Sequence, residues 1–278
     1  MTGTRSPAVA GQFYANGAAE LREQIEAAFE HPIGPGERPA VESGPASIRG
    51  LVSPHAGYPY SGPVAAHGFA RLARAGRPEA VVLLGPNHGG FGAPIAMSGA
   101  DRWETPLGSV PVETELRAEL ESYPGLTVDE STHEGEHSLE VQVPFLQYLY
   151  DDPVPILPIV LTQQSEESVD HLRSALAETI TGDTLVLAST DLTHYEPASA
   201  AERLDESILD AIEGLDADRI VEAARDGHTM CGWAPTAATL SVSRDRGAES
   251  GDVLTYATSG DTAGSADSVV GYVSAVVA

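Results

Sequence analysis

Three histidines of this sequence stand where a protein often places reactive groups. His55, His88 and His194 each come a few residues after a short run rich in Val, Leu and Ile. An imidazole in such a position can bind a metal ion or transfer a proton. A single histidine is usually a surface or capping residue, but three that follow three predicted strands are expected to lie on the same side of one sheet.

Two other residue types support a reactive site. Asp191 precedes His194 by three positions, and a carboxylate that bonds one ring nitrogen fixes the tautomer that a metal ligand or general base requires. Cys231 is the only cysteine, which excludes an internal disulfide. A predicted helix begins just after it and could lower its pKa. A thiolate at Cys231 would bind a metal ion well, although a lone cysteine is more often inert core packing.

A further histidine pattern points to different chemistry. His133-Glu134-Gly135-Glu136-His137 matches the zinc-protease pattern, in which two histidines one helical turn apart bind zinc and the glutamate activates water. The residues before it are polar, and the helical period begins only at Leu139. We therefore predict a polar loop capped at Ser138, with His137 and Glu140 facing the same site as the strand-tip residues. A zinc metallopeptidase that uses His133, Glu134 and His137 stays as a remote alternative.

The elements that must position these residues alternate along the chain. Short β-branched runs alternate with helical patterns, which favours a single α/β domain over residues 1–278 with a mixed or mostly parallel sheet flanked by helices on both faces. In that architecture ligands bind beyond the carboxyl ends of the strands. The predicted strands span 48–52, 80–84, 154–161, 184–188, 253–257 and 269–277, and the predicted helices span 21–29, 64–74, 114–122, 139–150, 165–179, 199–212, 218–225 and 234–243.

The composition limits the partners of the protein. There are 41 acidic and 15 basic residues, for a net charge of -26, and all of the basic residues are arginine. Lysine-dependent chemistry is therefore excluded. Such a charge is best screened at high salt, and it makes nucleic acid and anionic membranes poor partners. Since no signal peptide or membrane span is evident, we expect a cytoplasmic protein. The acidic composition predicts that the organism is a halophile. Homo-oligomerisation is left open.

Five motifs taken together resemble the Memo family, also known as protein B of the AmmeMemoRadiSam system. The segment 5–14 resembles the start of that family as well, so the similarity spans nearly the whole chain, and with the acidic composition it indicates a halophilic archaeon. The motifs are Pro54-His55-Ala56-Gly57-Tyr58, Gly85-Pro86-Asn87-His88, Glu136-His137-Ser138, Asp191-Leu192-Thr193-His194 and Cys231-Gly232.

The resemblance implies a fold like that of the class III extradiol ring-cleavage dioxygenases, whose iron(II) is held by two histidines and a glutamate. It implies that His55, His88 and Cys231 are the metal ligands. His194 then takes the acid/base position, with Asp191 and His137 lining the pocket. The third ligand is a thiolate in place of a carboxylate, and this softer donor favours copper(I), zinc or thiolate-bound iron.

Two functions follow as hypotheses. The first is a metal-dependent, dioxygenase-like oxidoreductase that uses iron(II) or copper, with zinc as a further candidate, and acts on an unknown small molecule or on O₂. The second is a non-catalytic module that buffers metal or binds a peptide or protein partner and keeps a vestigial dioxygenase pocket. The missing third carboxylate is the feature that favours the second hypothesis.

Overall fold

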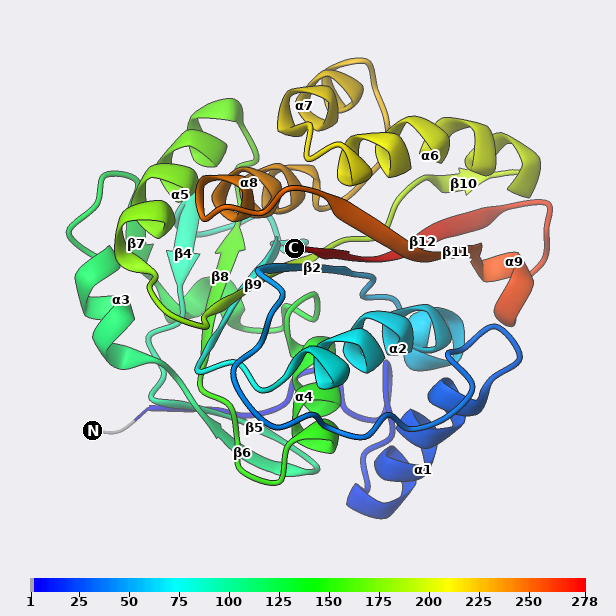
Figure 1. Cartoon of the computed structure of the whole chain (residues 1–278), viewed down its shortest axis with the longest axis horizontal. Coiled ribbons are helices and arrows are strands. Elements are labelled where there is room, and N and C mark those ends of the chain that lie inside the picture. Colours follow the sequence, from blue (N-terminus) through cyan, green and yellow to red (C-terminus); the bar gives the residue numbers. More distant parts are fainter. Residues whose placement is uncertain (1–2) are drawn as a thin grey trace.

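Residues 3–278, which the computed structural model describes, form a nine-stranded mixed sheet and a small three-stranded sheet (Figure 1). The strands are β1 (Thr4–Arg5), β2 (Gly50–Ser53), β3 (Val81–Pro86), β4 (Ile95–Met97), β5 (Arg102–Thr105), β6 (Gly108–Pro111), β7 (Leu126–Val128), β8 (Ile156–Leu161), β9 (Leu185–Ser189), β10 (His194–Glu196), β11 (Gly251–Thr258) and β12 (Val269–Val277).

Four parallel strands form the middle of the large sheet. Its order is β10-β12-β2-β9-β3-β8-β4-β7, with β11 paired to β12, and the parallel neighbours are β2, β9, β3 and β8. β12 and β4 border them in the antiparallel direction. Every residue of these four parallel strands is buried. Because both faces of a parallel sheet are covered, such strands are almost continuously apolar, and this is the signal that makes them readable in the sequence.

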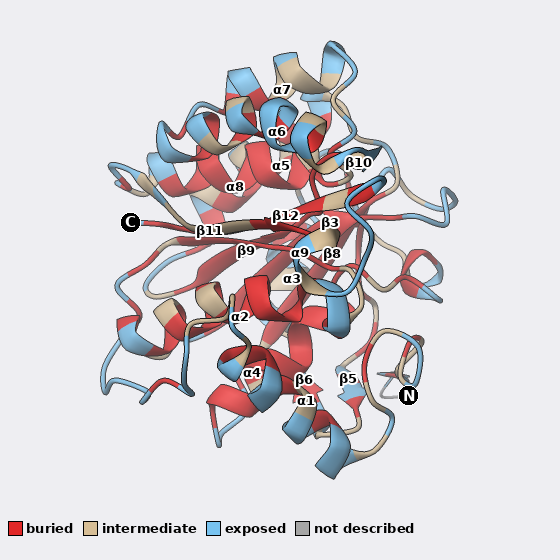
Figure 2. Ribbon diagram, turned by 90° about the vertical axis from the view of Figure 1, so that its right-hand side faces the viewer, coloured by how far each residue is buried: buried red, intermediate tan, exposed pale blue. Residues whose placement is uncertain are grey.

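Helices cover both faces of this sheet (Figures 1 and 2). On one face, α2 (Tyr58–Ala75) packs against β2 and β12, and α1 (Ala18–Glu30) and α4 (Val143–Leu149) pack against α2. On the other face, α8 (Trp233–Asp245) packs against β2, β3 and β9 beside α5 (Glu166–Thr179) and α7 (Ala217–Arg225). α6 (Ala198–Glu213) covers β11 and β12, α3 (Thr114–Leu120) contacts α5, and α9 (Ser259–Thr262) contacts α2.

The predicted fold class is confirmed: one α/β domain whose main hydrophobic core joins the sheet to both helical layers. All the predicted strands and helices are present, most with shifted ends; the strand predicted over 269–277 keeps those bounds, and the helix predicted over 139–150 is a 3-10 turn followed by α4. The helix predicted over 64–74 begins earlier, at Tyr58, because proline is well accommodated in a first helical turn and Pro59 lies there. In the described part of the chain no helix has the length and apolar character that a membrane crossing requires.

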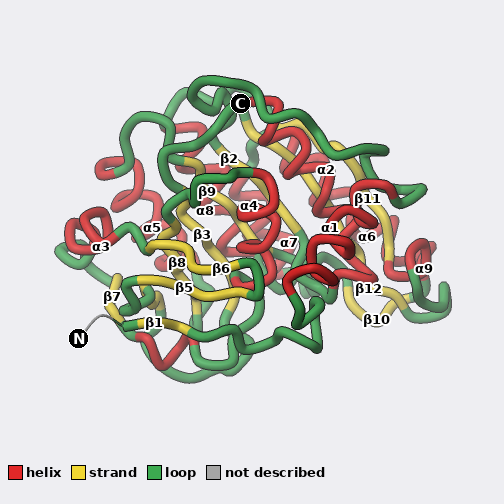
Figure 3. The backbone as a smooth tube through the Cα atoms, turned by 90° about the horizontal axis from the view of Figure 1, so that it is seen from below, coloured by secondary structure: helices red, strands yellow, loops and turns green. Residues whose placement is uncertain are grey.

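The strands absent from the prediction are short. β1, β5 and β6 form the three-stranded sheet near the N-terminus (Figure 3), and β4, β7 and β10 extend the edges of the large sheet. None of these six strands exceeds four residues. An alternating pattern that short is indistinguishable from a loop, so sheet pairing alone defines these strands.

Candidate metal centre

The four parallel strands deliver one polar residue each to the same edge of the sheet. His55 follows β2, Asp191 follows β9, His88 follows β3 and Gln164 follows β8. These strands are neighbours in that order, so their carboxyl ends lie side by side. This edge is where ligands bind in open α/β sheets.

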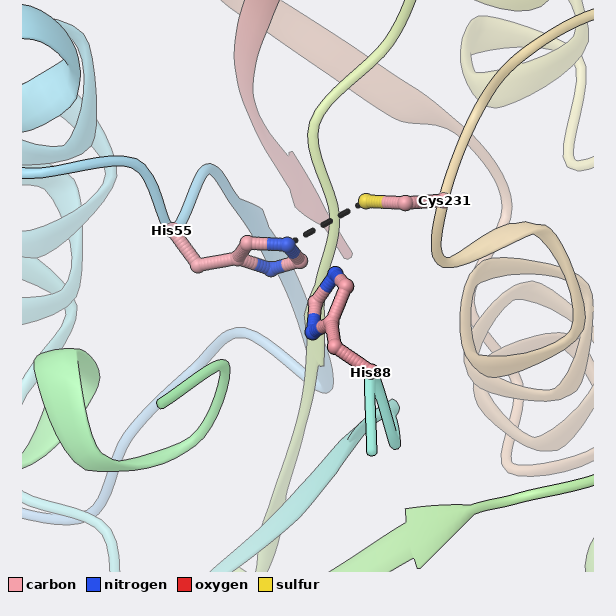
Figure 4. Close-up of side chains that lie close together, drawn as sticks. All are labelled: His55, His88 and Cys231. Carbon is pink, nitrogen blue, oxygen red and sulfur yellow. Dashed lines mark hydrogen bonds between the residues drawn. The ribbon is translucent and has the colours of Figure 1, made fainter. Parts of the chain in front are cut away.

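The three predicted metal ligands converge there (Figure 4). The ligand atoms of His55, His88 and Cys231 all lie within 4.8 Å of one another, and His55 Nε2 is 3.2 Å from Cys231 Sγ. In a tetrahedral site with bonds of about 2.3 Å to sulfur and about 2.0 Å to nitrogen, these two atoms would be about 3.5 Å apart. The donor set therefore fits a metal ion after a small adjustment.

A buried serine sets the tautomer of His55. Ser189 Oγ donates its single proton to Ser138 O at 2.6 Å and accepts from Gln142 Nε2 at 2.8 Å. It also lies 3.0 Å from His55 Nδ1, which must then be the protonated nitrogen. Burial, together with the neighbouring imidazoles, holds the pKa of His55 well below its usual value. His55 is consequently neutral, with the lone pair of Nε2 directed at Cys231.

Glu136 fixes the tautomer of His88 in the same way. Its carboxylate lies 3.1 Å from His88 Nδ1 and accepts from the backbone N–H groups of His88, His137 and Ser138. Burial would raise the pKa of Glu136, but these donors and the imidazoles lower it to about 2. Burial would lower the pKa of His88, but the hydrogen bond and charge of Glu136 outweigh it and raise the pKa. The other ring nitrogen of His88 points toward His55 and Cys231 (Figure 4).

Residues that follow β9 and β8 hold Cys231 in place. Its sulfur accepts a hydrogen bond from Asp191 N, after β9, at 3.1 Å. The side chain of Gln164, after β8, donates from Nε2 to Cys231 O at 2.6 Å and accepts at Oε1 from Ala234 N at 3.0 Å. Burial and the charge of Asp191 raise the pKa of the thiol. The expectation of a lowered pKa is therefore wrong, because burial outweighs the hydrogen bonds that Asp191 and Thr190 make to the sulfur.

The predicted pair of Asp191 and His194 is not formed. Asp191 Oδ1 accepts from the backbone N–H of His55 at 2.8 Å, while His194 Nδ1 lies 3.0 Å from Thr229 O. Burial raises the pKa of Asp191, and the nearby His194 acts in the opposite direction. Asp191 thus supports His55. His194 is half-buried and lies beside the centre, and its hydrogen bond to Thr229 O places the ring proton on Nδ1. Among the described residues, Nε2 of His194 has no hydrogen-bond partner.

His137 lies against His55 and His88, as expected. Its ring stacks on that of His88, with centroids 4.5 Å apart, and lies 5.5 Å from the ring of His55. Phe13 covers it with a centroid distance of 4.4 Å. Burial lowers the pKa of His137 to about 4. His88, Glu136 and His137 also form a second group whose ligand atoms lie within 4.8 Å of one another.

The structure does not support the metallopeptidase alternative. His133 ends a 3-10 helix (Glu130–His133), and Gly135 has φ 75°, so His133 and His137 do not share an α-helix. His133 Nε2 lies 3.1 Å from Ala96 O, and Glu134 is exposed. Among the described residues, no group of possible metal ligands includes His133.

The expectations for Ser138 and Glu140 are also wrong. Ser138 does not cap the following 3-10 helix (Glu140–Gln142), because its hydroxyl donates to Pro86 O at 2.8 Å. Glu140 faces away from the centre and binds Arg5 Nη1 at 2.7 Å and Tyr14 Oη at 2.6 Å. Glu140 therefore fastens the N-terminal segment, whose Phe13 covers His137.

Comparison with known proteins identifies the family. A family described as "Memo-like protein" matches residues 5–276. Proteins named as MEMO1 family members are 44% identical in Methanopyrus kandleri (98% of each chain covered), 45% identical in Methanothermobacter thermautotrophicus (96% of this chain and 98% of that one) and 43% identical in Metallosphaera sedula (96% and 97%). This chain belongs to the Memo family.

Proposed function

We propose that this chain is a metal-dependent oxidoreductase that binds iron(II) or copper through His55, His88 and Cys231 and acts on a small molecule. The observation that carries the proposal is the convergence of these three ligand atoms, with each imidazole held in one orientation by a buried partner. A redox-active ion bound there would supply electron transfer and a coordination position for O₂ or a substrate. The sulfur donor favours copper or thiolate-bound iron, with zinc as the redox-inert competitor.

The surrounding residues have distinct roles in this proposal. His194 has a free Nε2 and can accept or return a proton. Asp191 holds the backbone of His55, and His137 with Phe13 keeps water from one side of the ligands. The net charge of -26 favours a neutral or cationic small molecule over nucleic acid or an anionic membrane.

The test begins with metal content. The chain is purified without O₂ in high salt, loaded with iron(II), copper(I) or zinc, and dialysed, and O₂ consumption is then followed with candidate phenols. We expect about one ion per chain, loss of that ion in Cys231→Ala, and loss of turnover with retained metal in His194→Ala. His171→Ala, a histidine of α5, is the matched control and should behave as wild type. Absence of metal above background, or an unchanged metal content in Cys231→Ala, would refute the proposal.

A non-catalytic metal-buffering or partner-binding module is the second candidate, favoured by the thiolate that replaces a carboxylate ligand. Such a module would bind copper(I) or zinc tightly and show no turnover under any of these conditions. His194→Ala separates the two functions, because a buffering protein loses nothing when the proton-transfer residue is removed.

A further inference from the structure

Asp205, on α6, carries a carboxylate that is fully buried. Its Oδ1 accepts hydrogen bonds from Thr193 N at 3.1 Å, Thr193 Oγ1 at 2.7 Å and His228 Nε2 at 3.0 Å, and its Oδ2 accepts from Tyr256 Oη at 2.7 Å. A buried carboxylate is costly unless it is hydrogen-bonded in this way. These four donors come from three separate segments, so the carboxylate fixes them relative to one another.

Two of those segments carry residues of the metal centre. Thr193 lies directly between Leu192 and His194, in the loop that follows β9. His228 Nδ1 accepts the N–H of Met230 at 3.1 Å, and Met230 immediately precedes Cys231. Because Nδ1 is an acceptor, Nε2 carries the proton that is donated to Asp205. One carboxylate therefore holds both the loop 191–194 and the loop 228–231.

The two loops also bind each other directly at the centre. Cys231 N donates to Asp191 O at 3.2 Å, and Asp191 N donates to Cys231 Sγ at 3.1 Å. His194 N donates to Thr229 Oγ1 at 2.8 Å. These contacts require the two loops to keep a fixed position relative to each other. The side chain of Asp205 binds both loops, through Thr193 and His228.

We propose that Asp205 is a positioning residue that sets the place of the Cys231 sulfur, acting through His228 and Thr193. The inference rests on the proposed function in one respect, since it treats Cys231 as a metal ligand. In the described part of the chain, the hydrogen bonds of Asp205 go to Thr193, His228 and Tyr256 and not to His55, His88 or Cys231. Its role is to keep the sulfur within reach of His55.

The test uses Cys231 as its own probe, because it is the only cysteine of the chain. The rate of reaction with a disulfide reagent such as dithionitrobenzoate is measured on the folded, metal-free protein in high salt. Asp205→Ala and His228→Ala should raise this rate by about tenfold or more, because the loss of a buried hydrogen-bond partner makes opening of the loop that carries Cys231 easier. Asp205→Asn should restore a rate close to wild type, because the amide oxygen can still accept from Thr193 and His228.

Two controls separate positioning from general loosening. Glu206→Ala alters the exposed neighbour of Asp205 on the same helix. Leu21→Ala removes a fully buried side chain from α1, on the other face of the sheet, and destabilises the fold without touching either loop. A wild-type rate in both Asp205→Ala and His228→Ala would overturn the proposal, as would an equal rise in Leu21→Ala.

A metal measurement distinguishes this inference from the proposed function. Cobalt(II) bound by a thiolate shows a sulfur-to-metal charge-transfer absorption, which Asp205→Ala should weaken and Asp205→Asn should keep. If wild type shows no such absorption, the proposed metal function fails, while the thiol rates still decide whether Asp205 positions Cys231.

Discussion

His55 Nε2 lies 3.2 Å from Cys231 Sγ, although 176 positions separate the two residues in the chain. The opposite ring nitrogen of His55 is occupied by Ser189, so the thiol proton is the natural donor to Nε2. Metal binding must remove that proton, because a thiolate and not a thiol binds the ion. The two atoms are therefore already close together, and in the proposed metal centre the sulfur would favour the softer ions.

Replacing Cys231 with serine should change the metal preference. Serine keeps the size of the side chain but offers a hard oxygen that rarely ionises, so affinity for copper(I) should fall by at least about tenfold. Competition with a chromophoric copper(I) chelator measures the affinity of the wild type and the variant. An equal affinity in the two proteins would mean that the sulfur is not a ligand.

Replacing Ser189 with alanine should damage both stability and metal binding. The hydroxyl bonds His55, Ser138 and Gln142, and leaving buried partners unpaired costs about 1–3 kcal/mol. Loss of the bond to His55 Nδ1 should also lower metal affinity by about 10–100-fold. Urea unfolding and metal titration give the two values. Ser207→Ala is the control, because that hydroxyl bonds only within α6, and a similar loss there would argue against a specific role for Ser189.

The convergence of His55 and His88 could be predicted because their positions depend on strands that are readable in the sequence. β2 and β3 are short apolar runs, and parallel strands end at one edge, so His55 and His88 were expected together. Cys231 follows a loop and not a strand, so nothing in its local spacing places it at that edge. Its assignment came from the family resemblance, and the geometry agrees with it.

The hydrogen-bond partners of His55 and His88 could not be predicted, since these bonds depend on tertiary contacts. Asp191 and His194 are three residues apart, which suggests a pair, but His194 enters β10 and turns toward Thr229. Ser189 looks like an ordinary strand residue, and Glu136 looks like part of a polar loop. The bond of Ser189 to His55 joins residues 134 positions apart, and that of Glu136 to His88 joins residues 48 positions apart, so both appear only when distant segments meet.

Acid should destabilise the metal-free protein, and His133 should contribute. Burial lowers the pKa of His133, so below its ordinary value of about 6.5 the unfolded chain binds a proton that the folded chain does not. The free energy of unfolding should therefore fall as the pH drops through and below about 6.5, with a slope approaching about 1.4 kcal/mol per pH unit for each such imidazole.

The measurement is a set of urea unfolding curves between pH 7.5 and pH 5, as approximate limits set by that ordinary pKa. His133→Gln can keep the bond to Ala96 O but does not titrate, so it should show a shallower slope than wild type. Ser207→Ala, which removes no titratable group, is the control and should keep the wild-type slope. Equal slopes for wild type and His133→Gln would contradict the assignment.

Low salt should destabilise the fold. Even if every arginine paired with one carboxylate, 26 carboxylates would remain without a cationic partner, which is the net charge of -26. The Debye length is about 30 Å at 0.01 M salt and about 3 Å at 1 M, so repulsion acts across the whole domain in the first case and only between neighbours in the second. The midpoint of urea unfolding should therefore rise steadily with potassium chloride, and sucrose, which does not screen charge, should not reproduce the full effect at low salt. A midpoint and a circular dichroism spectrum that stay unchanged down to millimolar salt would show that the charges are too widely spaced to oppose folding.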